Sequence, residues 1–159
     1  MSTRASIRRH PIHPMLIVFP ITFFMAAPAL DVIHVATGDG LWARIAFWDI
    51  VLGVITALAA AVPGFVDYLS LHGRAGLLAT YHLVLNLTVV VLFGANLFLR
   101  GEAAQAWLGN AIWIPLALSI VGAVILGVSG WIGGHLVYVH RVGVSDDARD
   151  EVAQRRRAA

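Results

Sequence analysis

The sequence contains no cysteine and no lysine, and it carries few charges of either sign. Without cysteine the chain can form neither a disulfide nor a thiolate-bound metal or iron–sulfur site. Charged residues make up 13% of its 159 positions and hydrophobic residues 59%, whereas an ordinary soluble domain is about a quarter charged and about half apolar. This composition argues against a soluble enzyme, a disordered protein and a nucleic-acid-binding module. Its length predicts a single domain.

Long stretches without a permanent charge indicate where the chain crosses a membrane. An α-helix needs about 20 residues to cross about 30 Å of hydrocarbon, and such stretches cover residues 10–30, 50–66, 75–99 and 103–140. We predict transmembrane helices near 14–36, 43–68, 76–99 and 111–140, joined by short glycine-containing turns. The expected fold is all-α: an antiparallel four-helix membrane bundle over residues 1–145, followed by a charged tail over 146–159.

The arginines predict how this bundle sits in the membrane. Nine of the eleven precede the first helix, lie in the turn before the third, or follow the fourth. Only Arg44 and Arg100 fall on the other side. Because positive residues are enriched in cytoplasmic segments, both termini should be cytoplasmic. A cleaved signal peptide ending near residues 27–29 is the alternative, but its apolar run is long and Pro28 occupies the cleavage motif.

Ionisable side chains inside the helices are the candidate functional residues, because they are costly in lipid and should face the bundle interior. His13 opens the first helix, Asp67 closes the second and His82 lies near the start of the third. Antiparallel order puts these three at a similar depth near the cytoplasmic face, where we expect them to meet, with His135 on the same side. Two histidines and a carboxylate form a known metal-ligand set. The alternative is a hydrogen-bonded latch that fixes the order of the helices.

Four further polar residues are expected to have structural roles. Asp31 and Asp49 lie toward the opposite face of the membrane. Asn86 and Asn96 share one face of the third helix with His82. Lipid cannot satisfy an amide, so both asparagines should hydrogen bond to neighbouring helices.

The fourth helix carries a stripe of small residues at steps of three and four, which includes Gly127, Gly130 and Gly134. Such a stripe allows two backbones to approach closely, so we expect this helix to pack through it against the second or third helix. A flat cofactor lying against the glycines is the alternative.

Two sequence boxes resemble a known bacterial family. They are HPIHPMLIVFP at residues 10–20 and GWIGGHLVYVHRVGV at residues 130–144, with Phe65–Asp67 and His82–Asn86 between them. Over about residues 8–145 the chain is similar to a family of four-helix membrane proteins catalogued as a domain of unknown function. The resemblance implies a multi-pass protein of the bacterial inner membrane. Relatives fused to cytochrome c-like modules imply an association with electron transfer. A frequent family form of the second box has glutamate in place of His135, which favours His13 and His82 as ligands.

Three functions follow from these patterns. The first is a structural or accessory subunit without enzymatic activity, in contact with lipid and with a homo-oligomeric or membrane-complex partner. The second is a b-type cytochrome with one haem, held by His82 together with His13 or His135. The opposite layer offers only His34, which disfavours a second haem. The third is a metal or proton-handling site formed by His13, Asp67 and His82. No catalytic residue is predicted.

Overall fold

The computed structural model describes residues 5–8, 10–103 and 109–144, and the predicted tail over 146–159 lies outside them. Two short strands form an antiparallel pair near the N-terminus, and helices make up almost all of the remainder. In chain order the elements are β1 (Ser6–Ile7), β2 (His10–Pro11), α1 (Ile12–Leu16), α2 (Val18–Thr37), α3 (Gly40–Tyr68), α4 (Gly73–Ala103), the 3-10 helix η1 (Gly109–Ile112) and α5 (Trp113–Tyr138).

Local sequence explains where the first helices begin and end. Gly38 follows α2 with a left-handed φ of 71°, and its N–H donates to the carbonyl oxygen of His34 at 2.8 Å. Glycine adopts this conformation without strain. The carboxylate of Asp39 then caps α3 by accepting from the N–H of Leu41 at 2.9 Å. Only Ile17 separates α1 from α2. Pro20, in the first turn of α2, has no N–H to donate to the carbonyl oxygen of Leu16, so the helical ladder is interrupted there and α1 is a short segment of its own.

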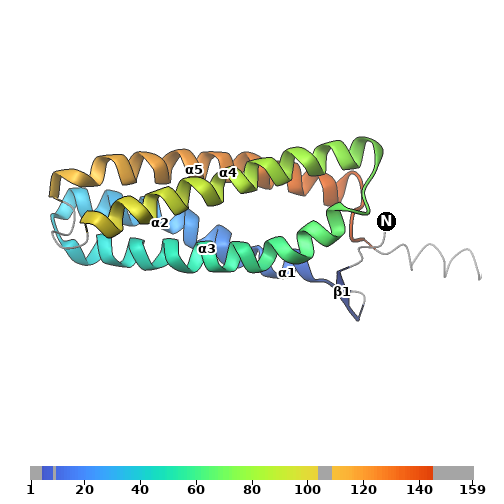
Figure 1. Cartoon of the computed structure of the whole chain (residues 1–159), viewed down its shortest axis with the longest axis horizontal. Helices are drawn as coiled ribbons and strands as arrows, with labels where there is room; N and C mark the ends of the chain where they lie inside the picture. The colour runs from blue at the N-terminus through green and yellow to red at the C-terminus, as the bar shows by residue number, and fades with distance from the viewer. Residues whose placement is uncertain (1–4, 9, 104–108, 145–159) are drawn as a thin grey trace, which may run out of the picture.

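The long helices form an antiparallel bundle (Figure 1). Ile12–Thr37, Gly40–Tyr68, Gly73–Gly101 and Trp113–Tyr138 are each 26 to 29 residues long and apolar enough to cross a membrane. The α2–α3 and α4–α5 hairpins pack on each other, with α2 against α5 and α3 against α4. The predicted all-α membrane bundle is therefore confirmed. Both described chain ends lie at one end of the bundle, which we call the terminal end (Figure 1).

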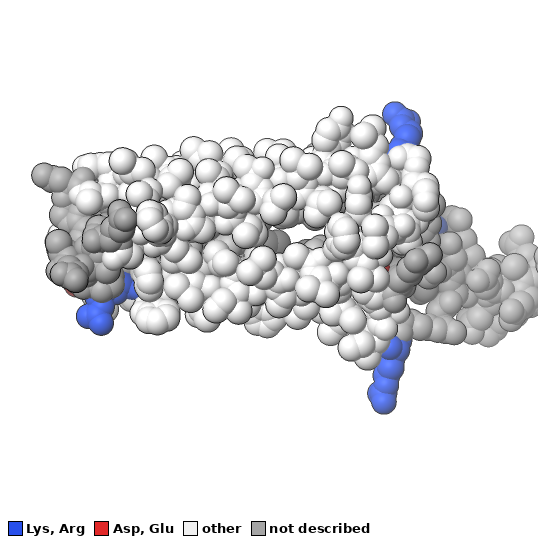
Figure 2. Space-filling view, in the orientation of Figure 1, with Lys and Arg blue, Asp and Glu red and all other residues white. Residues whose placement is uncertain are grey.

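The surface of the bundle matches a lipid environment. Charged side chains are visible only near the two ends of the face in Figure 2, and the surface between them is uncharged. Large apolar side chains such as Leu87, Val91 and Val124 are more than half exposed, which would be unfavourable in water but not in hydrocarbon. Trp131 and Tyr138, toward the terminal end, are more than four-fifths exposed. Aromatic rings of this kind are typical of the membrane–water interface.

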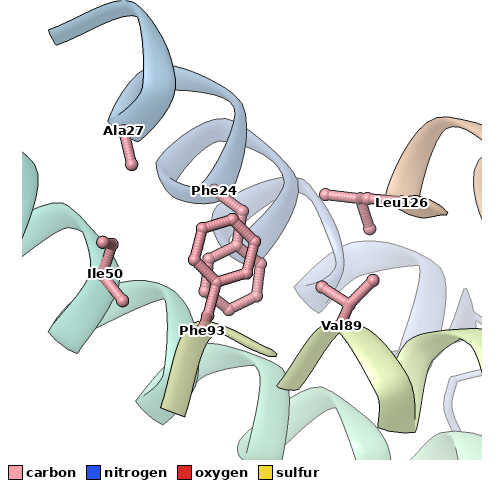
Figure 3. Packing of buried hydrophobic residues seen from close by; sticks show 6 residues of the cluster. All are labelled: Phe24, Ala27, Ile50, Val89, Phe93 and Leu126. Carbon is pink, nitrogen blue, oxygen red and sulfur yellow. The ribbon is translucent and has the colours of Figure 1, made fainter. Parts of the chain in front are cut away.

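Two stacked phenylalanine rings occupy the centre of the bundle (Figure 3). Phe24 of α2 and Phe93 of α4 are almost fully buried, with their centroids 4.1 Å apart and their planes at 7°. A Cβ at Gly53 would lie 2.5 Å from the ring of Phe24, and one at Gly122 would lie 2.7 Å from the ring of Phe93. These two glycines therefore make room for the rings. Ala27, Ile50, Val89 and Leu126 complete the cluster.

The glycine stripe of α5 is not a packing groove, contrary to the prediction. A Cβ at Gly127, Gly130 or Gly134 would meet no atom of the described residues within 4 Å. The side of α5 that faces the other helices is the one next to the glycine stripe. Its buried positions are Ser119, Gly122, Leu126, Ser129 and Leu136.

Candidate functional site

His13 is fixed against the middle of the neighbouring helix α3. Its Nδ1 lies 2.8 Å from the carbonyl oxygen of Ala60. A carbonyl oxygen can only accept, so Nδ1 carries a proton, and in the neutral ring Nε2 is the nitrogen with the lone pair. Gly64, one turn further along α3, makes this contact possible. A Cβ at that position would lie 2.7 Å from Nδ1 of His13.

His82 of α4 is fixed against α5 in the same manner. Its Nδ1 lies 2.9 Å from the carbonyl oxygen of Ser129 and 3.0 Å from the hydroxyl of that residue. The amide of Asn86 donates to the same hydroxyl and to the carbonyl oxygen of His82, both at 2.8 Å. Here too a glycine lies beside the ring, because a Cβ at Gly133 would be 3.0 Å from Cε1 of His82. The carbonyl of Ser129 again leaves Nε2 as the nitrogen with a free lone pair.

The two imidazole rings face each other across the bundle. Their centroids are 6.3 Å apart and their planes lie at 88°. A ring nitrogen lies about 1.1 Å from its centroid, because the ring bonds are about 1.3 Å long. With metal–nitrogen bonds of about 2.0 Å, imidazoles on opposite sides of one metal have centroids about 6 Å apart, and imidazoles at the tetrahedral angle about 5 Å. The observed separation of 6.3 Å is close to the first of these two values.

An opening in the surface lies beside this part of the bundle. Figure 2 shows the face hollowed between α3 and α4, and Figure 1 shows α1, which carries His13, at the same level. These two helices carry His82 and the carbonyl that holds His13. The hollow therefore lies between the helix that carries His82 and the helix whose carbonyl holds His13 (Figure 2).

The other predicted ligands lie apart from this pair. Asp67 is buried, and its Oδ1 accepts from the backbone N–H of Ala5 at 2.9 Å, which ties the N-terminal segment to α3. His135 is exposed, and its ring contacts that of His140 at 5.4 Å. In residues 5–8, 10–103 and 109–144, no three histidine or acidic side chains form a group that could hold a metal ion. His13 and His82 are thus brought together without a carboxylate.

A second polar cluster lies toward the opposite end of the bundle and joins α2, α4 and α5. Nη2 of Arg100 donates to Oδ2 of Asp31 at 2.5 Å, and both side chains are almost fully buried. Nε of Arg100 donates to Oδ1 of Asn96 at 2.7 Å. The amide nitrogen of Asn96 donates to the hydroxyl of Ser119 at 2.8 Å and to the carbonyl oxygen of Pro115 at 2.9 Å. These hydrogen bonds satisfy the ion pair only in part, because Oδ1 of Asp31 and Nη1 of Arg100 are buried without a hydrogen-bond partner among the described residues.

Sequence reasoning assigned part of this cluster incorrectly. It placed Arg100 in the turn after the third helix, whereas α4 continues to Ala103 and the guanidinium points inward. Asp49, which was grouped with Asp31, is only half-buried on α3. Ser129 and Ser119 were not recognised as partners of the asparagines. One feature of the sequence points to the Asp31–Arg100 pair. Arg100 follows Asp31 by 69 residues, the same spacing that separates His82 from His13.

Comparison with known proteins agrees with this architecture. The model of a family described as predicted membrane protein, DUF2231, matches residues 9–146. No curated protein and no solved structure matches the chain. The match covers all four long helices together with the histidine pair and the buried ion pair. The chain is therefore a multi-pass membrane protein that belongs to the DUF2231 family.

Proposed function

We propose that this protein binds one haem b between His13 and His82 and carries electrons within the bacterial inner membrane. The observation that supports this most directly is the geometry of the pair. Two imidazoles are held through Nδ1, each keeps a lone pair on Nε2, and their centroids are 6.3 Å apart. Metal-ligating histidines usually donate their other ring nitrogen to a carbonyl or carboxylate in this way.

The absence of a third ligand favours haem over a bare metal ion. Protein sites for zinc supply three or four ligands, and the described residues offer no such group. A haem iron already has four nitrogen ligands from its own macrocycle and needs only two axial ligands. His13 and His82 suffice for haem and not for an ion such as zinc.

The surroundings of the pair suit a flat, apolar group. The opening between α3 and α4 lies at the level of α1 (Figures 1 and 2), and Gly64 and Gly133 make room for the two imidazole rings. Haem supplies one-electron redox chemistry when bound. His13 and His82 would hold the haem, and the chemistry that it would supply there is electron transfer.

A structural role is the competing function. Each histidine joins two helices through its Nδ1, as a latch would, and the asparagine contacts are of the same kind. A latch needs neither a free Nε2 nor a fixed ring separation. The two functions therefore differ in whether anything binds at Nε2.

The deciding experiment is the absorbance of the full chain purified in mild detergent from cells supplied with haem precursor. We expect a Soret band and, after reduction, the sharp α band of a six-coordinate haem. His13→Ala and His82→Ala should each remove the six-coordinate spectrum. His135→Ala, a histidine of the same end that lies apart from the pair, should leave it unchanged. If the parent protein contains neither haem nor, by elemental analysis, a metal ion, the proposal is refuted and the pair is a latch.

A further inference from the structure

The contacts of the first two long helices recur in the last two at a constant spacing. The Nδ1 of His13 bonds to a carbonyl 47 residues later, and the Nδ1 of His82 does the same. Each histidine lies over a glycine four residues beyond that carbonyl. Phe24 lies over Gly53 and Phe93 over Gly122 in the same way. Every member of the second set follows its counterpart by 69 residues: His13 and His82, Phe24 and Phe93, Gly53 and Gly122, Ala60 and Ser129, Gly64 and Gly133.

Two of these corresponding pairs, and a third pair at the same spacing, are also in contact with each other. The rings of His13 and His82 lie at 6.3 Å, those of Phe24 and Phe93 stack at 4.1 Å, and Asp31 is bonded to Arg100. Corresponding residues of two like units meet only near the two-fold axis that relates the units. The three contacts succeed one another along α1, α2 and α4, so this axis runs along the bundle. Both units begin at the terminal end (Figure 1), as expected for such an axis.

We infer that the chain is a tandem pair of one two-helix unit, residues 10–68 and 79–137, and that the surface between the units is built to join unlike partners. The first unit presents a carboxylate on the axis and the second a guanidinium. Two copies of the first unit would place two carboxylates together in the interior, and two copies of the second would place two guanidinium groups there. Like charges at this distance in an apolar interior are strongly unfavourable.

The neighbours of the ion pair make the two units unlike in a second way. Asn96 and Ser119 of the second unit contact the ion pair directly. The corresponding residues of the first unit are Ala27 and Ile50, which belong to the apolar core. The second unit therefore holds its own guanidinium in place, and the first supplies only the counter-charge. The inner face of the first unit thus fits a helix pair that presents an arginine at the position corresponding to Asp31.

This arrangement matters more in lipid than it would in water. Lipid chains are as apolar as the helices, so burial of apolar surface does not drive one helix to choose another. Packing and polar contacts make the choice instead. A charge pair on the axis is a strong determinant, because it favours the unlike partner and also penalises the like one.

The test exchanges the charges in the full chain and measures folded protein, as the monodisperse fraction after solubilisation in mild detergent. Asp31→Arg alone and Arg100→Asp alone should each lose most of that fraction. The combined variant Asp31→Arg/Arg100→Asp should recover folded protein, although less than the parent, because Asn96 no longer accepts from the guanidinium and Ser119 no longer donates to the carboxylate. The control Asp49→Arg/Arg100→Asp has the same change in composition with the new arginine away from the axis, and should show no recovery.

Three results would overturn the inference: single variants as well folded as the parent, an exchanged variant no better than the worse single one, or equal recovery in the control. The measurement requires no bound haem, so it stands or fails independently of the proposed function.

Discussion

Alanine substitution of the glycines of α3 and α5 should destabilise the protein at Gly64, which lies beside His13, and not at the glycines that face outward. At Gly64 the new Cβ would lie 2.7 Å from Nδ1 of His13, whereas ordinary contact begins at about 3.4 Å. The ring would have to withdraw by about 0.7 Å. The Nδ1 to oxygen distance, now 2.8 Å, would then approach the limit for a hydrogen bond, about 3.5 Å.

The expected size of the effect follows from three contributions. Overpacking costs about 1–3 kcal/mol, the lost hydrogen bond costs about 1 kcal/mol, and replacing a helical glycine by alanine gains about 1 kcal/mol. Gly64→Ala should therefore lower the free energy of unfolding by about 1–3 kcal/mol. Gly133→Ala, with its Cβ 3.0 Å from His82, should cost less. Gly130→Ala meets open space and should cost nothing.

The assay is unfolding of the purified protein in mixed micelles, followed by circular dichroism as the denaturing detergent is increased. The order of stability should be Gly130→Ala, then Gly133→Ala, then Gly64→Ala. If Gly64→Ala is as stable as Gly130→Ala, the ring of His13 does not occupy the space above Gly64, and the geometry assigned to the histidine pair is wrong.

The remaining predictions concern the core, the caps, the polar contacts and the orientation. Phe93→Ala removes a fully buried, stacked ring and should cost about 3–5 kcal/mol in the same assay; a cost below that of Gly64→Ala would contradict the packing. Gly38→Ala forces a side chain into a left-handed conformation and should cost about 1–2 kcal/mol, measured as a lower thermal midpoint. Asn86→Ala breaks two hydrogen bonds and should lower the free energy of unfolding by about 1 kcal/mol. A substitution of the outward-facing Val91 should leave that free energy unchanged. A reporter active only outside the cytoplasm should be active when fused after Gly38 and inactive when fused after Gly73; the reverse result would invert the predicted orientation.

The helices could be predicted from the sequence because the bilayer imposes a simple rule. A spanning segment must be long and uncharged, and the gaps between charged residues therefore located all four helices. The same rule was wrong at Arg100, because it ends a helix at every charged residue, whereas α4 continues past this arginine. Arg100 is buried because it bonds to Asp31, 69 residues away on another helix. The sequence of one helix alone does not reveal such a partner.

The candidate site was predictable in part, for a related reason. His13 and His82 were expected at one depth, because antiparallel order fixes depth. Whether Asp67 joined them depended on the position of the N-terminal segment, whose backbone N–H occupies that carboxylate instead. The small residues of α5 fall on two adjacent sides of the helix, one with Gly130 and one with Gly122 and Ser129. Spacing alone does not tell which side faces a neighbour.

The opening between α3 and α4 lies on the side of the bundle rather than at either of its ends (Figure 2). A molecule dissolved in the hydrocarbon layer can approach it laterally, without passing through the water at either end of the bundle. Hydrophobic solutes accumulate in the bilayer, so the concentration at the entrance is set by partitioning into lipid rather than by solubility in water. For such a molecule, approach to the opening is a two-dimensional search within the membrane plane.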